Sequence, residues 1–71
     1  MTIEKIRNNI HDNMGNVAFI THNEGRNKIL EYEGKIIEAY RNIFVILDKD
    51  SKRSFSYHDI LTDTTKVSFK M

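Results

Sequence analysis

The sequence predicts a mainly β protein, an SH3-like five-stranded small barrel with an N-terminal amphipathic helix. Apolar residues follow a helical period only at the start of the chain. From Asn16 onward they form short runs divided by polar clusters, as strands do. One short segment of helical character precedes the last of these runs. An OB-type barrel usually carries a helix between its third and fourth strands, and no segment there is long enough for one.

The first element is predicted as a helix from near residue 3 to near residue 13. Its apolar residues recur at intervals of three and four, which places them along one face: Ile3, Ile6, Ile10 and Met14. Thr2 is the predicted N-cap, and Gly15 is expected in the left-handed conformation that ends a helix. A helix of about three turns is marginal in isolation, so we expect it to pack against the rest of the chain.

The next two elements are predicted strands joined by a turn. The first strand covers residues 17–21, and the turn covers residues 23–26, where Gly25 can adopt a positive φ without steric cost. The second strand runs from residue 28 to about residue 38. Gly34 interrupts it, and an isolated glycine in a strand marks a bulge or a sharp bend that lets a sheet curl.

Residues 43–47 are predicted as a third strand without any polar member. A strand with one solvated face alternates apolar and polar residues, whereas this strand is apolar at both parities. We therefore expect both of its faces to be covered, one by the barrel interior and the other by the N-terminal helix. The polar residues 48–52 are expected to form the turn that follows.

The last part of the chain is predicted as a strand, one helical turn and a final strand. Phe55 and Tyr57 share one face of the fourth strand. Residues 58–61 form the helical turn, with the carboxylate of Asp59 as its cap. Apolar and polar residues alternate in the fifth strand, with Val67, Phe69 and Met71 on one face and Lys66, Ser68 and Lys70 on the other.

The composition fits a single domain over residues 1–71, with the helix in residues 1–15 and the barrel in residues 16–71. The chain has 71 residues, with 11 Lys and Arg against 10 Asp and Glu, and its formal net charge is +1. It contains no Cys, which excludes a disulfide framework and makes the cytoplasm the expected compartment. Charged residues interrupt the N-terminal segment, which predicts neither a signal peptide nor a membrane span, and no membrane partner is expected.

No residue pattern predicts a catalytic or metal site. The His residues lie in separate elements without a chelating spacing: His11, His22 and His58. Glu31 and Glu33 lie on one face of a strand and are expected on the solvent side. The serines have no nucleophile-elbow context. Because the interior is used for packing, we expect no enzymatic activity, no cofactor, no metal and no small-molecule substrate.

The basic residues near turns and strand ends are the candidate contact residues for a partner: Arg26, Lys28, Lys35, Arg41, Lys52 and Arg53. Small barrels bind nucleic acid through such turns with the help of exposed aromatic rings, for which Tyr32 and Tyr40 are available. The net charge of +1 is low for a dedicated nucleic-acid-binding protein.

Several motifs carry a family resemblance, and they follow one another along the chain: Gly25-Arg26-x-Lys28, Gly34, Glu38-x-Tyr40, Ile43-Phe44-Val45-Ile46 and Ser54-x-Ser56-Tyr57-x-Asp59-Ile60-Leu61-Thr62. In order and spacing, from residue 25 to residue 69, they resemble the Veg family of small bacterial proteins. The helix ending in Met14-Gly15 fits the N-terminal segment of that family. The chain departs from the family pattern at Asn27, where a second basic residue is usual, and at Arg41, where Pro is common.

The resemblance implies a cytoplasmic, non-enzymatic protein that stimulates biofilm formation and regulates transcription by acting on regulators. Our first hypothesis is an interaction module. In it, an exposed strand edge, or a face beside the helix, binds a regulatory protein or a second copy of the chain as a homodimer. The alternative hypothesis is direct nucleic-acid binding through the basic turns.

Overall fold

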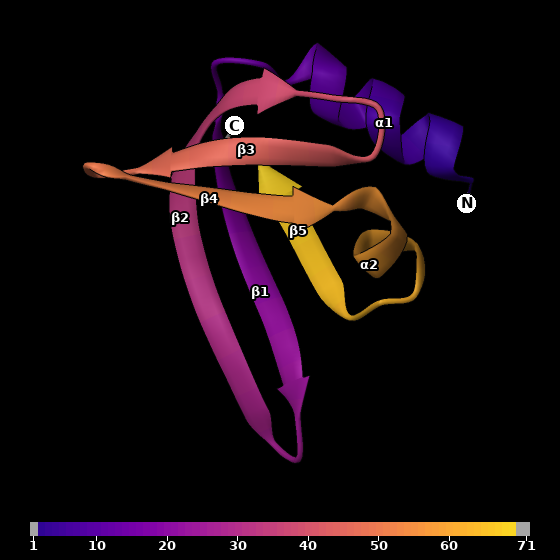
Figure 1. Cartoon of the computed structure of the whole chain (residues 1–71), viewed down its shortest axis with the longest axis vertical. Helices are drawn as coiled ribbons and strands as arrows, with labels where there is room; N and C mark the ends of the chain where they lie inside the picture. Colours follow the sequence, from indigo (N-terminus) through magenta and orange to yellow (C-terminus); the bar gives the residue numbers. More distant parts are fainter. Residues whose placement is uncertain (1, 70–71) are drawn as a thin grey trace.

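The structure is a computed structural model that describes residues 2–69, and it shows a strongly curled antiparallel sheet with two helices beside it (Figure 1). The sheet has five strands in the order β4-β3-β2-β1-β5. The elements are α1 (Ile3–Asp12), β1 (Val17–Gly25), β2 (Lys28–Ala39), β3 (Ile43–Asp48), β4 (Ser51–Ser56), α2 (Tyr57–Leu61) and β5 (Thr65–Phe69). The mainly β fold is therefore confirmed, and the element order is consistent with the predicted SH3-like barrel.

Helix α1 forms where the apolar period predicts it. The Thr2 hydroxyl accepts a hydrogen bond from the Lys5 amide at 3.2 Å, which confirms the N-cap. Ile6 and Ile10 are buried, whereas Met14 lies beyond the end of the helix and is exposed. Gly15 has the expected positive φ, 85°, and its amide donates to the Ile36 carbonyl at 2.8 Å. The chain after α1 is thus fixed directly to the sheet.

Strands β1 and β2 form a long hairpin that projects from the body of the molecule (Figure 1). The predicted end of the first strand was wrong, because pairing with β2 continues past Thr21 to Gly25. Gly25 has a φ of 99°, as expected. Arg26 and Asn27 also adopt positive φ values of 32° and 65°, so the reversal lies two residues later than predicted. Cross-strand hydrogen bonds explain the extension, because they stabilise polar residues that have little strand propensity of their own.

Strand β2 bends where Gly34 allows the backbone of β3 to come close. A Cβ atom on Gly34 would lie 2.7 Å from the Leu47 carbonyl oxygen, which is too short for any side chain. The irregularity in the pairing of β2 with β3 falls between Ile36 and Glu38 rather than at the glycine. Gly34 therefore allows the backbones of β2 and β3 to approach closely. The bulge that changes the direction of β2 comes after it, between Ile36 and Glu38.

The boundary between β4 and α2 corrects two predictions. Tyr57 is the first residue of α2 rather than a member of the fourth strand beside Phe55. Its ring is nevertheless buried and stacks on Phe44, with ring centroids 5.8 Å apart. The N-cap of α2 is Ser56, whose hydroxyl accepts from the His58 amide at 3.1 Å. Asp59 lies inside the first turn, so it cannot occupy the capping position that we predicted for it.

Strand β5 keeps the predicted alternation over the residues described. Thr65 is buried, Val67 and Phe69 are half-buried, and the residues between them are exposed. Lys70 and Met71 lie outside the described residues. The buried Thr65 hydroxyl lies 2.7 Å from His22 Nδ1 on the neighbouring strand, so its polar group has a partner.

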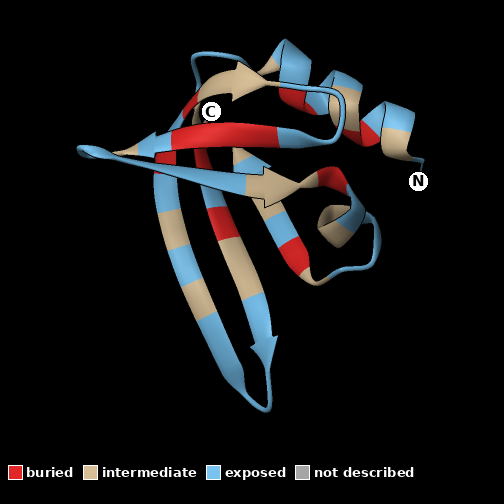
Figure 2. Ribbon diagram, in the orientation of Figure 1, coloured by how far each residue is buried: buried red, intermediate tan, exposed pale blue. Residues whose placement is uncertain are grey.

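The core lies on the inner face of the sheet, which is the concave side that also receives α1 and α2. Its buried residues are Ile6, Ile10, Ala18, Ile20, Ile36, Phe44, Ile46 and Tyr57. Helix α1 packs mainly against α2 and β2, and its buried isoleucines join this same core. The expectation that α1 covers the second face of β3 was therefore wrong. Figure 2 shows the buried middle of β3 between exposed ends.

Candidate partner-binding surface

The six predicted contact cations do not form one patch. Arg26 and Lys28 lie at the tip of the β1–β2 hairpin, and Arg41 lies in the connection between β2 and β3. The remaining cations lie on opposite faces of the sheet: Lys35 and Lys52 on the outer face, Arg53 on the inner face. Three of the six form ion pairs at 3.7–4.0 Å: Lys28 with Glu24, Lys52 with Glu38 and Arg53 with Asp48.

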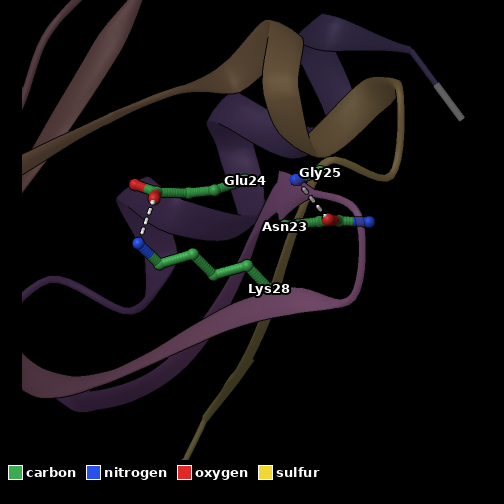
Figure 3. A network of polar contacts seen from close by, with 4 residues as sticks. All are labelled: Asn23, Glu24, Gly25 and Lys28. Atoms are coloured by element: carbon green, nitrogen blue, oxygen red, sulfur yellow. Dashed lines mark hydrogen bonds and ion pairs between the residues drawn. The ribbon is translucent and has the colours of Figure 1, made fainter.

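The hairpin tip is ordered by its own short-range contacts (Figure 3). The Asn23 side chain accepts a hydrogen bond from the Gly25 amide at 2.8 Å, as in an Asx turn. The Lys28 ammonium lies 3.7 Å from a Glu24 carboxylate oxygen. This pair offsets one of the two positive charges of the tip, so the hairpin end is only weakly basic.

Arg53 has a contact of its own within the molecule. Its guanidinium carbon lies 4.9 Å from the centroid of the Tyr32 ring, and its Nε lies 4.0 Å from an Asp48 oxygen. Tyr32 in turn meets Phe55 edge to face, with centroids 5.4 Å apart. Arg53 thus covers the ring of Tyr32, which itself packs on Phe55. This contact gives Arg53 a packing role.

Lys35 and Lys52 flank an exposed apolar residue on the outer face. In the strand register Leu47 pairs with Lys35 of β2 on one side and with Lys52 of β4 on the other. Paired residues of neighbouring strands share a face. The Lys52 ammonium also lies 3.9 Å from the Glu38 carboxylate. These two cations therefore lie on either side of β3.

The outer face of β3 is apolar along its whole length. Its residues are Ile43, Val45 and Leu47, named here the β3 outer stripe, and they alternate with the inward-facing Phe44 and Ile46. Ile43 is 38% exposed and Leu47 is 37% exposed. The described part of the chain leaves the two ends of this stripe in contact with solvent.

The outer positions of the other strands are mostly polar. Glu31 and Glu33 are exposed on β2, as predicted, and Lys66 and Ser68 are exposed on β5. Phe19 on β1 and Ile29 on β2 are exposed apolar exceptions. The contrast between β3 and its neighbours is the feature that distinguishes one region of the outer face, because single exposed apolar residues are common on protein surfaces.

Within residues 2–69, strand β4 has β3 as its one strand neighbour, so it lies beside the stripe at an edge of the sheet. Lys52 and Ser54 of β4 are exposed on the outer face. An edge strand presents backbone amides and carbonyls in the plane of the sheet, and it can be extended by a strand from another chain. A lysine on an edge strand, such as Lys52 here, is a common device against unselective pairing.

Two tyrosines have perturbed acidity for different reasons. The Tyr40 hydroxyl donates a hydrogen bond to Glu38, and this bond, with smaller contributions from burial and from the charge of Glu38, raises the pKa of Tyr40. Burial raises the pKa of Tyr57, and the charge of Arg7 acts in the opposite direction. Neither tyrosine lies beside a nucleophilic side chain and a base that could activate it. Neither pKa shift therefore indicates catalysis.

A second group of polar residues surrounds the β2–β3 connection, which sequence analysis represented by Arg41 alone. Arg7 Nε donates to the Arg41 carbonyl at 3.1 Å and links α1 to this connection. Both residues line a solvent-open hollow of about 520 Å³, together with Asn8, His11, Ala39 and Tyr40. Arg7 and His11 were missed. Their i, i+4 spacing on the polar side of the helix was the available signal.

Among residues 2–69, no three His, Asp or Glu side chains gather where they could hold a metal ion. Neither helix within that range is long and apolar enough to cross a membrane. The hollows that the structure shows are open at the surface, such as one of about 270 Å³ between the β1–β2 hairpin and the start of β5. The inner face, by contrast, is filled by the core.

Comparison with known proteins supports one assignment. A family model described as "Biofilm formation stimulator VEG" matches residues 1–68 of the 71-residue chain. The match confirms the resemblance, both in the motifs from residue 25 onward and in the N-terminal helix. No curated protein matches the chain.

Proposed function

The chain belongs to the Veg family of biofilm formation stimulators, and we propose that it acts as a non-enzymatic cytoplasmic protein that regulates transcription through contact with a protein regulator. The observation that carries this proposal is the β3 outer stripe. A strand that faces solvent on one side normally places polar residues there, whereas β3 exposes Ile43 and Leu47 there, on either side of the buried Val45. A second protein surface supplies the cover that the rest of the chain does not provide for these two ends.

The surroundings of the stripe fit the anatomy of a protein interface. Interfaces combine an apolar centre with a polar rim. Here the rim contains Lys35 and Lys52 beside Leu47, and Glu38 and Ser54 beside Val45. The partner surface is therefore expected to present apolar side chains flanked by acidic groups that lie opposite the two lysines.

The exposed edge of β4 adds a second element to the same surface. A partner strand added to β4 would place its outward-facing side chains beside Lys52 and Ser54, on the same face of the sheet as the stripe. Backbone hydrogen bonds would supply affinity, and the apolar stripe would supply selectivity. This arrangement corresponds to the predicted exposed strand edge, and it requires no catalytic group.

The test is affinity capture from a nuclease-treated lysate of the host cells, with tagged wild type and two single variants. Leu47→Glu places a carboxylate in the stripe between Lys35 and Lys52. Leu61→Glu is the matched control, because Leu61 is 38% exposed against 37% for Leu47 and lies on α2. Equal melting temperatures must first show that both variants fold.

We expect the wild type and Leu61→Glu to capture the same protein, and Leu47→Glu to capture at least about tenfold less of it. Equal capture by all three chains, or capture of nothing by the wild type, would overturn the proposal. Sedimentation of the purified chain identifies self-association. A wild-type dimer that Leu47→Glu converts to monomers would assign the stripe to a second copy and would contradict contact with a regulator.

A further inference from the structure

We infer that the hollow between α1 and the β2–β3 connection binds the phosphate backbone of a single-stranded nucleic acid, with Arg7 and Arg41 as the phosphate contacts and Tyr40 as a stacking platform. None of the residues that line this hollow belongs to the β3 outer stripe, and the site goes beyond the proposed regulatory contact. Of the cations predicted from sequence, it contains only Arg41.

The two arginines are held next to each other by a backbone contact. Arg7 is half-buried on α1, and its Nε donates to the Arg41 carbonyl at 3.1 Å. A guanidinium has five N–H donors, so this bond leaves the two terminal nitrogens available. The connection between β2 and β3 runs beside α1 in Figure 1. Residues 34 positions apart in the sequence are thus brought to one surface.

Neither arginine is neutralised within residues 2–69. The ion pairs found there involve Lys28, Lys52 and Arg53, and no acidic residue is among those that line the hollow. Two arginines that line one hollow without a carboxylate among its lining residues make that hollow positively charged, and this charge attracts an anion. Arginine is well suited to phosphate because its planar fork can donate two parallel hydrogen bonds.

Tyr40 indicates which phosphate compound fits. Its side chain is 51% exposed, lies at the same hollow, and is oriented by the hydrogen bond from its hydroxyl to Glu38. The Glu38 charge is itself offset by Lys52 at 3.9 Å. An exposed aromatic ring beside phosphate contacts is the arrangement that binds unpaired bases by stacking. A free phosphate or a lipid headgroup has no base to place on this ring.

His11 extends the polar lining of the hollow along α1. It lies one helical turn after Arg7, is exposed, and lines the same hollow with Asn8. The His11 ring and the Asn8 amide both offer hydrogen-bonding groups to a ligand there. The hollow of about 520 Å³ is open to solvent, so a chain can pass across it rather than enter a closed pocket.

The test is fluorescence anisotropy of a labelled twelve-nucleotide oligouridylate, titrated with the full chain at low salt and then at rising salt. The variant is Arg7→Ala/Arg41→Ala. The matched control is Lys49→Ala/Lys66→Ala, which removes the same charge from exposed positions outside the hollow. Because Arg7 is half-buried, the single variant Arg41→Ala, at an exposed position, keeps the test valid if the double variant unfolds.

We expect Arg7→Ala/Arg41→Ala to weaken binding by at least about tenfold. It should also reduce the slope of log Kd against the logarithm of the salt concentration by roughly 1.4, the value for two phosphate contacts on a single strand. Arg41→Ala alone should reduce this slope by about half as much, because it removes one phosphate contact. Tyr40→Leu should weaken binding by about tenfold, and Tyr40→Phe should retain it, because stacking needs the ring and not the hydroxyl. The control variant should bind more tightly than the arginine variant.

Three results would overturn the inference. These are no binding of the oligonucleotide by the wild type at low salt, equal losses in the arginine and control variants, and binding of anionic phosphatidylglycerol vesicles in place of the oligonucleotide. Leu47→Glu is expected to bind the oligonucleotide like the wild type. The two proposals are therefore tested separately: loss of support for nucleic-acid binding at the hollow would leave partner binding at the β3 outer stripe untouched, and the reverse also holds.

Discussion

Gly34 of β2 lies against the carbonyl group of Leu47 in β3, so closely that a Cβ atom on the glycine would come within 2.7 Å of the Leu47 oxygen. This contact holds the backbone of β3 against the bend of β2. Leu47 is also the residue whose side chain projects from the outer face between two lysines. The glycine therefore positions the β3 outer stripe that we assign to partner binding.

Gly34→Ala is expected to destabilise the fold by about 1–3 kcal/mol, because the new methyl group would force two paired strands apart. Gly25→Asn is the control. A side chain there meets no atom within 4 Å, and Asn tolerates a positive φ better than most residues. Denaturant midpoints measure both changes. A Gly34→Ala midpoint equal to that of the wild type would show that the close contact is unimportant.

The N-cap of α2 gives a second prediction. Ser56→Ala is expected to cost about 0.5–2 kcal/mol, since the His58 amide loses the hydroxyl that accepts its hydrogen bond. Asp59→Ala should cost less, because this residue lies in the first turn and does not cap the helix. Thermal unfolding of the two variants decides between them. A larger loss of stability in Asp59→Ala than in Ser56→Ala would support the capping role that was predicted for Asp59 from the sequence.

Tyr57 gives a prediction about pH. Its hydroxyl is buried without a hydrogen-bond partner among residues 2–69, so Tyr57→Phe is expected to be neutral or stabilising at pH 7. Burial raises the pKa of Tyr57, so the folded state holds this proton more tightly than the unfolded state. The associated stability is complete below about pH 10 and is lost as the pH rises further.

The measurement is the difference in unfolding free energy between wild type and Tyr57→Phe across the alkaline range. Wild type should lose stability relative to the variant above about pH 10. Parallel curves would contradict the assignment of this alkaline loss to Tyr57. Tyr57→Ala should cost about 3–5 kcal/mol, because the ring fills the core beside Phe44.

Arg53 separates packing from partner binding. Arg53→Ala is expected to cost about 0.5–1 kcal/mol through loss of the contact with the Tyr32 ring. Asp48→Asn should have a smaller effect, because exposed ion pairs contribute little. Chemical denaturation measures both. Capture of the protein partner should be unchanged in Arg53→Ala, and a loss of capture would return Arg53 to the candidate contact residues.

Local sequence patterns predicted most of the fold because they reflect short-range physics. The helical spacing of Ile6 and Ile10 and the alternation around Val67 are set by the periods of helix and strand. The hairpin beyond Thr21 was missed because its polar residues form a strand only through pairing with β2. Tyr57 was placed one element too early, because a buried aromatic residue suits a strand and a helix start equally well.

The surface was harder to predict than the fold. The apolar run 43–47 correctly indicated a strand with two apolar faces, but it carried no information on what covers the second face. The contact between Arg7 and Arg41 depends on how α1 docks, and no short-range pattern specifies that arrangement. Lys35 and Lys52 were predicted as contact residues separately, without any relation between them. Only the strand register shows that both flank Leu47.

The proposed role is tested most directly by measuring biofilm mass in host cells from which the gene has been deleted. The deleted cells are supplied with the wild type, Leu47→Glu or Leu61→Glu at equal protein levels. We predict that the wild type and Leu61→Glu restore biofilm formation and that Leu47→Glu does not, although it folds with the same melting temperature. Full restoration by Leu47→Glu would contradict the assignment of biofilm stimulation to the β3 outer stripe.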